Sequence, residues 1–131
     1  MVVRLGLGFV GLFHVANGLA MLVFPERWAA LVVHLGAPDH LHLHFIADIA
    51  MAFLASGAGL LLAARRGAGN ALWAVAGAAW PLLHALIHLK DWLGDGLPAT
   101  LQGVLSEGMG VILVGALGVF LAWRRVREGD A

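Results

Sequence analysis

The chain has 131 residues, of which 61% are hydrophobic and 12% are charged, and its mean hydropathy is +0.89. A soluble domain needs a far more polar surface, so this composition excludes an ordinary soluble protein and predicts an integral membrane protein. The net charge of zero gives no reason to expect a nucleic-acid partner, and the lack of cysteine excludes disulfides, thiolate metal sites and iron–sulfur clusters.

Four apolar segments are each long enough to cross the hydrocarbon of a bilayer, which takes about 20 helical residues. Because backbone polar groups in lipid must be satisfied within their own segment, each is predicted to be a helix. We therefore expect one all-α domain over residues 1–131, an integral membrane four-helix up-and-down bundle. The four predicted spans are Val2 to Phe24, His42 to Ala64, Asn70 to Leu89 and Ala99 to Trp123.

The first span begins like a secretory signal, with Arg4 ahead of an apolar run. His14 and Asn17 interrupt that run and no small-x-small cleavage site follows, so we predict a retained span instead. The loop after it is the longest, and its stretch ERWAALVVHLG has a helical spacing that favours a short helix along the membrane surface.

Basic residues predict the orientation of the bundle. Cytoplasmic loops of membrane proteins carry an excess of Lys and Arg. Six arginines fall on the side of the termini and the second loop, and only Arg27 and Lys90 fall on the other side, so both termini are predicted to be cytoplasmic. The six are Arg4, Arg65, Arg66, Arg124, Arg125 and Arg127.

Position along a span gives depth, because each helical residue rises about 1.5 Å. With this orientation, six titratable residues share the outer half of the bilayer. Ionisable residues inside spans usually face the bundle interior and mark a site, so these six form the candidate metal or cofactor site. They are His14, His44, Asp48, His84, His88 and Glu107. By contrast, His34, His40 and His42 fall in a loop or at the interface, where a solvated or headgroup-facing role is expected.

Pro81 and Asn17 are predicted to have structural roles. Proline cannot donate a backbone hydrogen bond, so Pro81 leaves the carbonyl near Gly77 without its helical partner and can kink the third span beside His84. Small residues let membrane helices pack closely, and this is the simplest role for the glycines within the spans. These include Gly8, Gly11, Gly18, Gly57, Gly77, Gly103 and Gly110.

A transition metal or haem b is the first candidate ligand. His84 and His88 are four residues apart on one helix and can share an ion, with His14 and His44 supplied by neighbouring helices. Asp48 and Glu107 would be ligands or would orient a histidine ring. Haem b would need axial histidines on facing helices, for instance His14 with His84. The HExxH zincin motif and HxxHH-type clusters do not occur.

Two other classes of function remain open. A histidine and a carboxylate near the outer surface can also bind a quinone or a small lipophile between helices. Alternatively, the polar residues only join helices by hydrogen bonds worth about 0.6 to 2 kcal/mol each, as in a non-catalytic accessory or structural subunit. Short loops favour a binder or a subunit over a self-sufficient enzyme. The expected partners are the bilayer and either subunits of a membrane complex or further copies of the chain.

Four stretches in chain order resemble small bacterial membrane proteins of the DoxX-like type. They are NGLAMLVFPERW, HFIADIAMAFLASGAGLLLAARR, HALIHLKDW and GDGLPATLQGVLSEGMG, and the resemblance covers nearly the whole chain. The resemblance implies an up-and-down four-helix protein of the bacterial inner (cytoplasmic) membrane. For some relatives it also implies association with quinone-linked oxidoreductases.

Overall fold

The computed structural model describes residues 1–32, 43–67 and 69–129, and the regular elements within these ranges are helices. Four helices there are long and apolar enough to cross a membrane, which confirms the all-helical prediction and indicates a multi-pass membrane protein. The fourth of them is built from α5, a π-helical segment η2 and α6 in continuous succession. The elements are α1 (Val2–Val23), α2 (Pro25–Val32), α3 (Leu43–Ala63), α4 (Asn70–Asp95), α5 (Leu101–Glu107), η2 (Gly108–Leu113) and α6 (Val114–Gly129).

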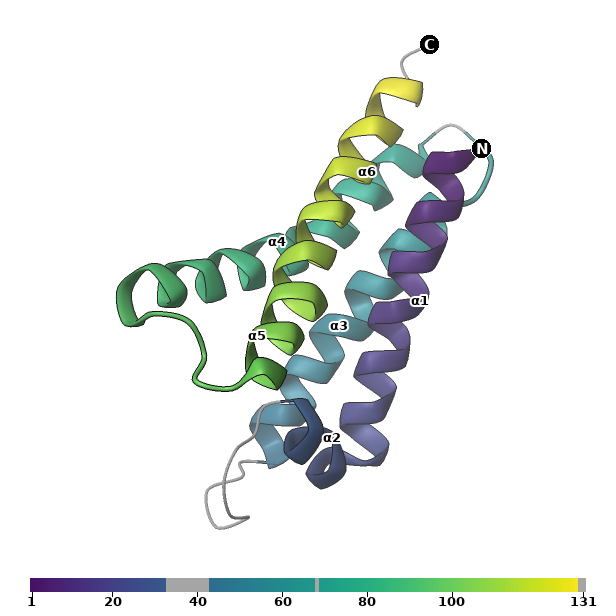
Figure 1. Cartoon of the computed structure of the whole chain (residues 1–131). Helices are drawn as coiled ribbons and strands as arrows, with labels where there is room; N and C mark the ends of the chain where they lie inside the picture. Colours follow the sequence, from purple (N-terminus) through teal and green to yellow (C-terminus); the bar gives the residue numbers. More distant parts are fainter. Residues whose placement is uncertain (33–42, 68, 130–131) are drawn as a thin grey trace.

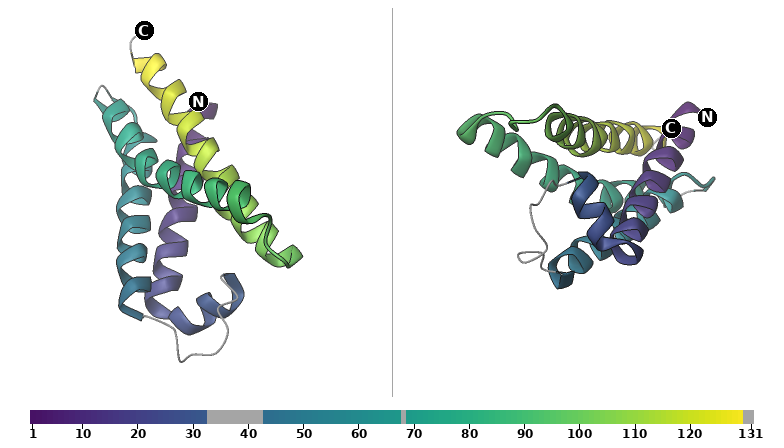
Figure 2. Two further views of the ribbon diagram at one scale, coloured as in Figure 1. Left: turned by 90° about the vertical axis from the view of Figure 1, so that its left-hand side faces the viewer. Right: turned by 60° about the horizontal axis from the view of Figure 1, so that its bottom comes forward.

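The long helices alternate in direction, and each packs against two others (Figure 1). Helix α1 contacts α3 and α6, and α4 contacts the same two. The start of α1, the end of α3, the start of α4 and the end of α6 lie together, and we call this the terminal end. Helix α2 lies at the opposite end, and the second half of α4 diverges sideways from α1 and α3 (Figures 1 and 2). We call the region that contains α2 and the second half of α4 the histidine end.

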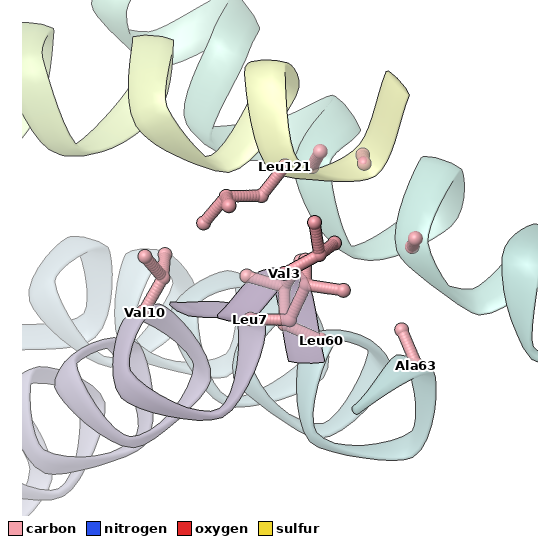
Figure 3. Close-up of a cluster of buried hydrophobic side chains, with 9 residues drawn as sticks. Val3, Leu7, Val10, Leu60, Ala63 and Leu121 are labelled. Carbon is pink, nitrogen blue, oxygen red and sulfur yellow. The ribbon is translucent and has the colours of Figure 1, made fainter. Parts of the chain in front are cut away.

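Apolar side chains from four helices, with Ala74 and Ala78 contributed by α4, meet near the terminal end. Figure 3 shows Val3, Leu7 and Val10 of α1 beside Leu60 of α3 and Leu121 of α6. Leu7, Val10 and Leu60 are fully buried. Burial of such side chains stabilises a soluble protein against water, but in a bilayer the gain comes mainly from close packing, because lipid is equally apolar.

Glycines make that close packing possible between α1 and α3. A Cβ atom on Gly57 would lie 2.7 Å from the carbonyl oxygen of Gly11, and one on Gly11 would lie 3.0 Å from the carbonyl oxygen of Gly57. Two turns along, a Cβ on Gly18 would lie 2.9 Å from the carbonyl oxygen of Ala50. The two backbones therefore approach so closely that no larger residue fits without a shift.

The predicted packing role is wrong for other glycines. A Cβ on Gly110 would meet nothing within 4 Å. One on Gly103 would meet Pro98 and Thr100, which belong to the cap of its own helix rather than to a neighbouring span. Composition alone does not distinguish a glycine that faces a neighbouring helix from one on an outer face or in a helix cap.

Pro81 does free a carbonyl, and α3 supplies the donor that satisfies it. The hydroxyl of Ser56 donates a hydrogen bond of 2.5 Å to the carbonyl oxygen of Gly77, four residues before the proline. The carbonyl that the proline leaves without its helical partner therefore accepts a hydrogen bond from a neighbouring span. Helix α4 continues through Pro81 and ends at Asp95, beyond the Leu89 expected, because Gly96 at φ 91° is the first residue to leave helical geometry.

Two arginines cap the end of α3. The Nε of Arg4 donates to the carbonyl of Ala64 at 2.9 Å, and the Nε of Arg125 donates to the carbonyl of Ala63 at 3.1 Å. The Nη2 of Arg125 also reaches the carbonyl of Arg65 at 3.3 Å. The last carbonyls of a helix have no hydrogen-bond partner within the helix. Cations near them are also stabilised by the negative end of the helix dipole. Helices α1 and α6 are thereby attached to α3 at the terminal end.

The short helix expected after the first span is present as α2 over Pro25–Val32. The Nε1 of Trp28 donates to Oδ1 of Asn17 at 2.9 Å, so Asn17 holds α2 against α1. The Nε2 of Gln102 donates to the carbonyl of Leu31 at 2.6 Å and joins α2 to α5.

Candidate functional site

His14 lies in the middle of α1, and its side chain is completely enclosed. The residue is 2% exposed, and its ring packs against the ring of Phe53 of α3, with centroids 5.3 Å apart. Neither ring nitrogen finds a hydrogen-bond partner among the residues that the structure describes. A buried polar group normally has a partner, so His14 needs an explanation other than ordinary packing.

Helix α4 brings two more rings to the same place. The ring of His84 stacks on that of Trp80, with centroids 5.3 Å apart and planes at 14°, and meets the ring of Phe53 edge-on at 5.8 Å. The indole nitrogen of Trp80 is also buried without a partner in the described part of the chain. We call His14, Phe53, Trp80 and His84 the aromatic cluster.

A carboxylate adjoins the cluster on its more exposed side. The rings of His84 and His88 meet edge-on with centroids 4.9 Å apart, and Nδ1 of His88 lies 3.1 Å from Oε2 of Glu107. The same oxygen accepts a hydrogen bond of 2.7 Å from Nε1 of Trp92. The side chains of His88 and Glu107 are 26% and 31% exposed, so a polar path leads from the surface towards His84.

Backbone geometry beside Glu107 is unusual. Glu107 ends α5, and the π-helical segment η2 starts at the next residue. Such segments are rare and recur at functional sites, where they alter the direction in which neighbouring side chains point. Gly108 also matters here, because a Cβ on it would lie 3.0 Å from Cη2 of Trp92 and would push this indole away from the carboxylate.

The structure does not bring His44 and Asp48 to this cluster. Both side chains are on the outer face of α3, 93% and 65% exposed, and Nε2 of His44 lies 3.5 Å from Oδ2 of Asp48. The expectation that they face the pair His84 and His88 is wrong for a geometric reason. His44 is nine residues before Phe53, about two and a half helical turns, so the two side chains point in opposite directions.

Four of the six predicted residues therefore meet, and three aromatic partners were missed. His14, His84, His88 and Glu107 come together from α1, α4 and α5. The missed partners are Phe53, Trp80 and Trp92. The sequence contained a signal for the tryptophans, since Trp80, His84, His88 and Trp92 follow one another at intervals of four on one helix. His34, His40 and His42 lie outside the described residues.

Metal binding at this cluster finds no support among the described residues. The described residues include no group of three or more His, Asp or Glu side chains placed to hold one. One nitrogen of His88 is already engaged by Glu107, and the rings of His14 and His84, the pair suggested for haem, both pack against Phe53. The cluster instead combines apolar ring surfaces with a few polar atoms that have no partner in the described part of the chain, a combination typical of sites for small organic ligands.

Comparison of the chain with protein-family models, curated proteins and solved structures gave no match.

Proposed function

We propose that the protein is a multi-pass protein of the bacterial inner membrane that binds a quinone or a similar small lipophile at the aromatic cluster. One observation carries this proposal: three buried polar atoms, both ring nitrogens of His14 and the indole nitrogen of Trp80, have no partner among the described residues. They lie next to aromatic rings, and the carboxylate of Glu107 is linked to those rings through His88, whose ring meets that of His84.

Energetics favour a ligand over ordinary packing. Each buried polar group without a partner costs about 1–3 kcal/mol relative to one that is hydrogen-bonded. An indole N–H can only donate, while a neutral imidazole donates through one nitrogen and accepts through the other. A quinone carbonyl would accept from Trp80 or His14, and a quinol hydroxyl would donate to His14. Binding would recover the lost hydrogen bonds and place the ligand's ring against Phe53 and His84.

The position of the cluster suits a ligand that arrives through the bilayer. Beyond Pro81 the second half of α4 diverges from α3 (Figure 2), and Ile87, on the same side of α4 as His84, is 55% exposed. A lipophile would enter laterally along this edge. Glu107 and His88, which are partly exposed, would exchange protons between the bound ligand and the membrane surface.

The proposal includes the orientation of the chain in the membrane. The six arginines at the terminal end, against Arg27 and Lys90 elsewhere, favour cytoplasmic termini and an outward-facing histidine end. A C-terminal alkaline phosphatase fusion should be inactive and a C-terminal fluorescent fusion active, and the reverse would contradict the orientation.

The DoxX-like resemblance adds the proposal that the protein associates with a quinone-linked oxidoreductase, which would then co-purify with it.

A matched pair of tryptophan variants tests the ligand. Trp80→Phe keeps a ring but removes the buried N–H, whereas Trp73→Phe makes the same change at an exposed position of the same helix. Equilibrium dialysis of short-chain ubiquinone against the purified protein in nanodiscs should show binding to the parent and to Trp73→Phe, and roughly tenfold weaker binding to Trp80→Phe. Equal binding by both variants, a Soret band or stoichiometric metal would contradict the proposal.

A further inference from the structure

The outer face of α3 differs from the outer faces of the other spans. On the other spans many outward positions carry large apolar side chains, such as Leu5, Phe9 and Leu12 on α1. The first turn of α3 exposes His44 together with Leu43 and Phe45, and the exposed positions beyond it hold Asp48 followed by mostly small residues. We call this the α3 outer face, and it consists of His44, Asp48, Met51, Ala55 and Ala58.

The α3 outer face is poorly suited to contact with lipid alone. Asp48 lies five residues inside the start of α3, about 7.5 Å along the helix axis, with its side chain 65% exposed. A carboxylate inside a span costs several kcal/mol when it faces hydrocarbon, and such residues almost always face protein or water. Leucine or phenylalanine would fill this face better if it contacted acyl chains only.

From these observations we propose that the α3 outer face is the interface of a homodimer, in which α3 of one copy packs against α3 of a second copy. A twofold axis along the membrane normal sets the two helices parallel. Each residue then lies level with its own counterpart, and His44 of each copy can contact Asp48 of the other diagonally, one turn along the helix. Each buried pair would satisfy the other by hydrogen bonds across the helices.

Residue size and spacing also support a second copy of the chain as the partner of the α3 outer face. The five positions are separated by four, three, four and three residues, which is the seam along which two parallel helices pack. Ala55 and Ala58 lack side chains that would hold two backbones apart, as is common where membrane helices associate. The outer face of α1 has the same spacing, but its bulky side chains are suited to lipid. The proposal does not depend on the ligand of the aromatic cluster, which lies on the opposite side of α3.

The natural lack of cysteine makes disulfide trapping a clean test. Cysteine is introduced singly in the full chain in native membranes, at Ala55 on the α3 outer face or at the exposed alanines Ala16 of α1 and Ala116 of α6. A disulfide needs Cα atoms within about 7 Å, so Ala55→Cys should convert most of the protein to a covalent dimer upon mild oxidation, whereas Ala16→Cys and Ala116→Cys should not. Equal trapping at all three positions, no trapping at Ala55→Cys, or its trapping to a different protein would overturn the proposal.

A charge swap tests the contact itself. His44→Asp places like charges together and should weaken dimerisation, measured by single-molecule photobleaching in lipid vesicles, by about tenfold or more. The double variant His44→Asp with Asp48→His restores opposite partners and should recover the dimer. Failure of the swap to recover it would mean that the pair does not meet its counterpart in a second copy.

Discussion

The two ends of the bundle are built on opposite principles. At the terminal end the polar groups described above are paired, since Arg4 and Arg125 satisfy the last carbonyls of α3, and glycines bring α1 and α3 into backbone contact. At the histidine end α4 diverges, and a π-helical segment interrupts the fourth span. His14 and Trp80 there keep buried polar atoms without partners among the residues that the structure describes. The first end has the features of a stability element and the second those of a binding site.

This contrast has a general physical meaning. Proteins place strained or unsatisfied groups where a ligand or a reaction needs them, and the rest of the fold must be stable enough to hold them there. If the contrast is correct, substitutions at the terminal end should lower stability in proportion to the contacts they break. Substitutions at the histidine end should instead alter binding and leave stability unchanged or higher.

The largest loss of stability is expected at the glycine contact between α1 and α3. Gly57→Ala would place a methyl group 2.7 Å from the carbonyl oxygen of Gly11 and 2.9 Å from the backbone nitrogen of Val15, neither of which can move aside cheaply. The expected cost is about 3 kcal/mol in the free energy of unfolding, measured by steric trapping in bicelles. Gly8→Ala on α1 is the control, because its methyl group would make an ordinary contact of 3.8 Å with Ala64. Equal losses in the two variants would refute the packing argument.

Removing the cap on α3 should have the next largest effect. Arg125→Met keeps a long apolar stem but leaves the carbonyls of Ala63 and Arg65 without their charged donor. A hydrogen bond from a charged group contributes about 1.5–3 kcal/mol, so a loss of about 2 kcal/mol is expected in the same unfolding assay. Arg124→Met removes an exposed neighbour and should change stability by no more than about 0.5 kcal/mol. A similar loss from both substitutions would point to net charge rather than to the cap.

A smaller and more specific effect is expected where the two ends meet. Ser56→Ala removes the donor to the carbonyl that Pro81 leaves free and should cost about 1 kcal/mol. In a Pro81→Ala background the residue at this position can donate to the same carbonyl, so the cost of Ser56→Ala should largely vanish. A double-mutant cycle measures this coupling, and additive losses would show that Ser56 does not substitute for the missing helical bond.

The sequence predicted the parts of this structure that depend on position along a helix axis. Four stretches of span length became four long helices, and counting residues from the charged ends placed His14, His84, His88 and Glu107 at one level. Pro81 likewise predicted a free carbonyl without reference to any neighbour. Each of these inferences needs only the rise of a helix and the chemistry of one residue.

The failures concern direction around the helix and the identity of neighbours. His44 and Asp48 are on the same helix as Phe53 but point away from it, and depth alone does not reveal this. Similarly, the sequence did not identify Ser56 as the donor to the carbonyl of Gly77. Nor did it identify Phe53 as the ring that contacts both α1 and α4. Which face of a span turns inward is decided by its packing partners, so it emerges only when the helices are placed together.

We infer that the buried imidazole of His14 is retained for a ligand and not for stability. His14→Leu replaces it with an apolar side chain of similar volume, and unfolding of the ligand-free protein and dialysis binding of short-chain ubiquinone are measured on the same preparation. Because two nitrogens that have no partner among the described residues disappear, the free energy of unfolding should rise by about 1–2 kcal/mol while quinone binding is lost. A less stable variant that still binds quinone as the parent does would contradict this inference.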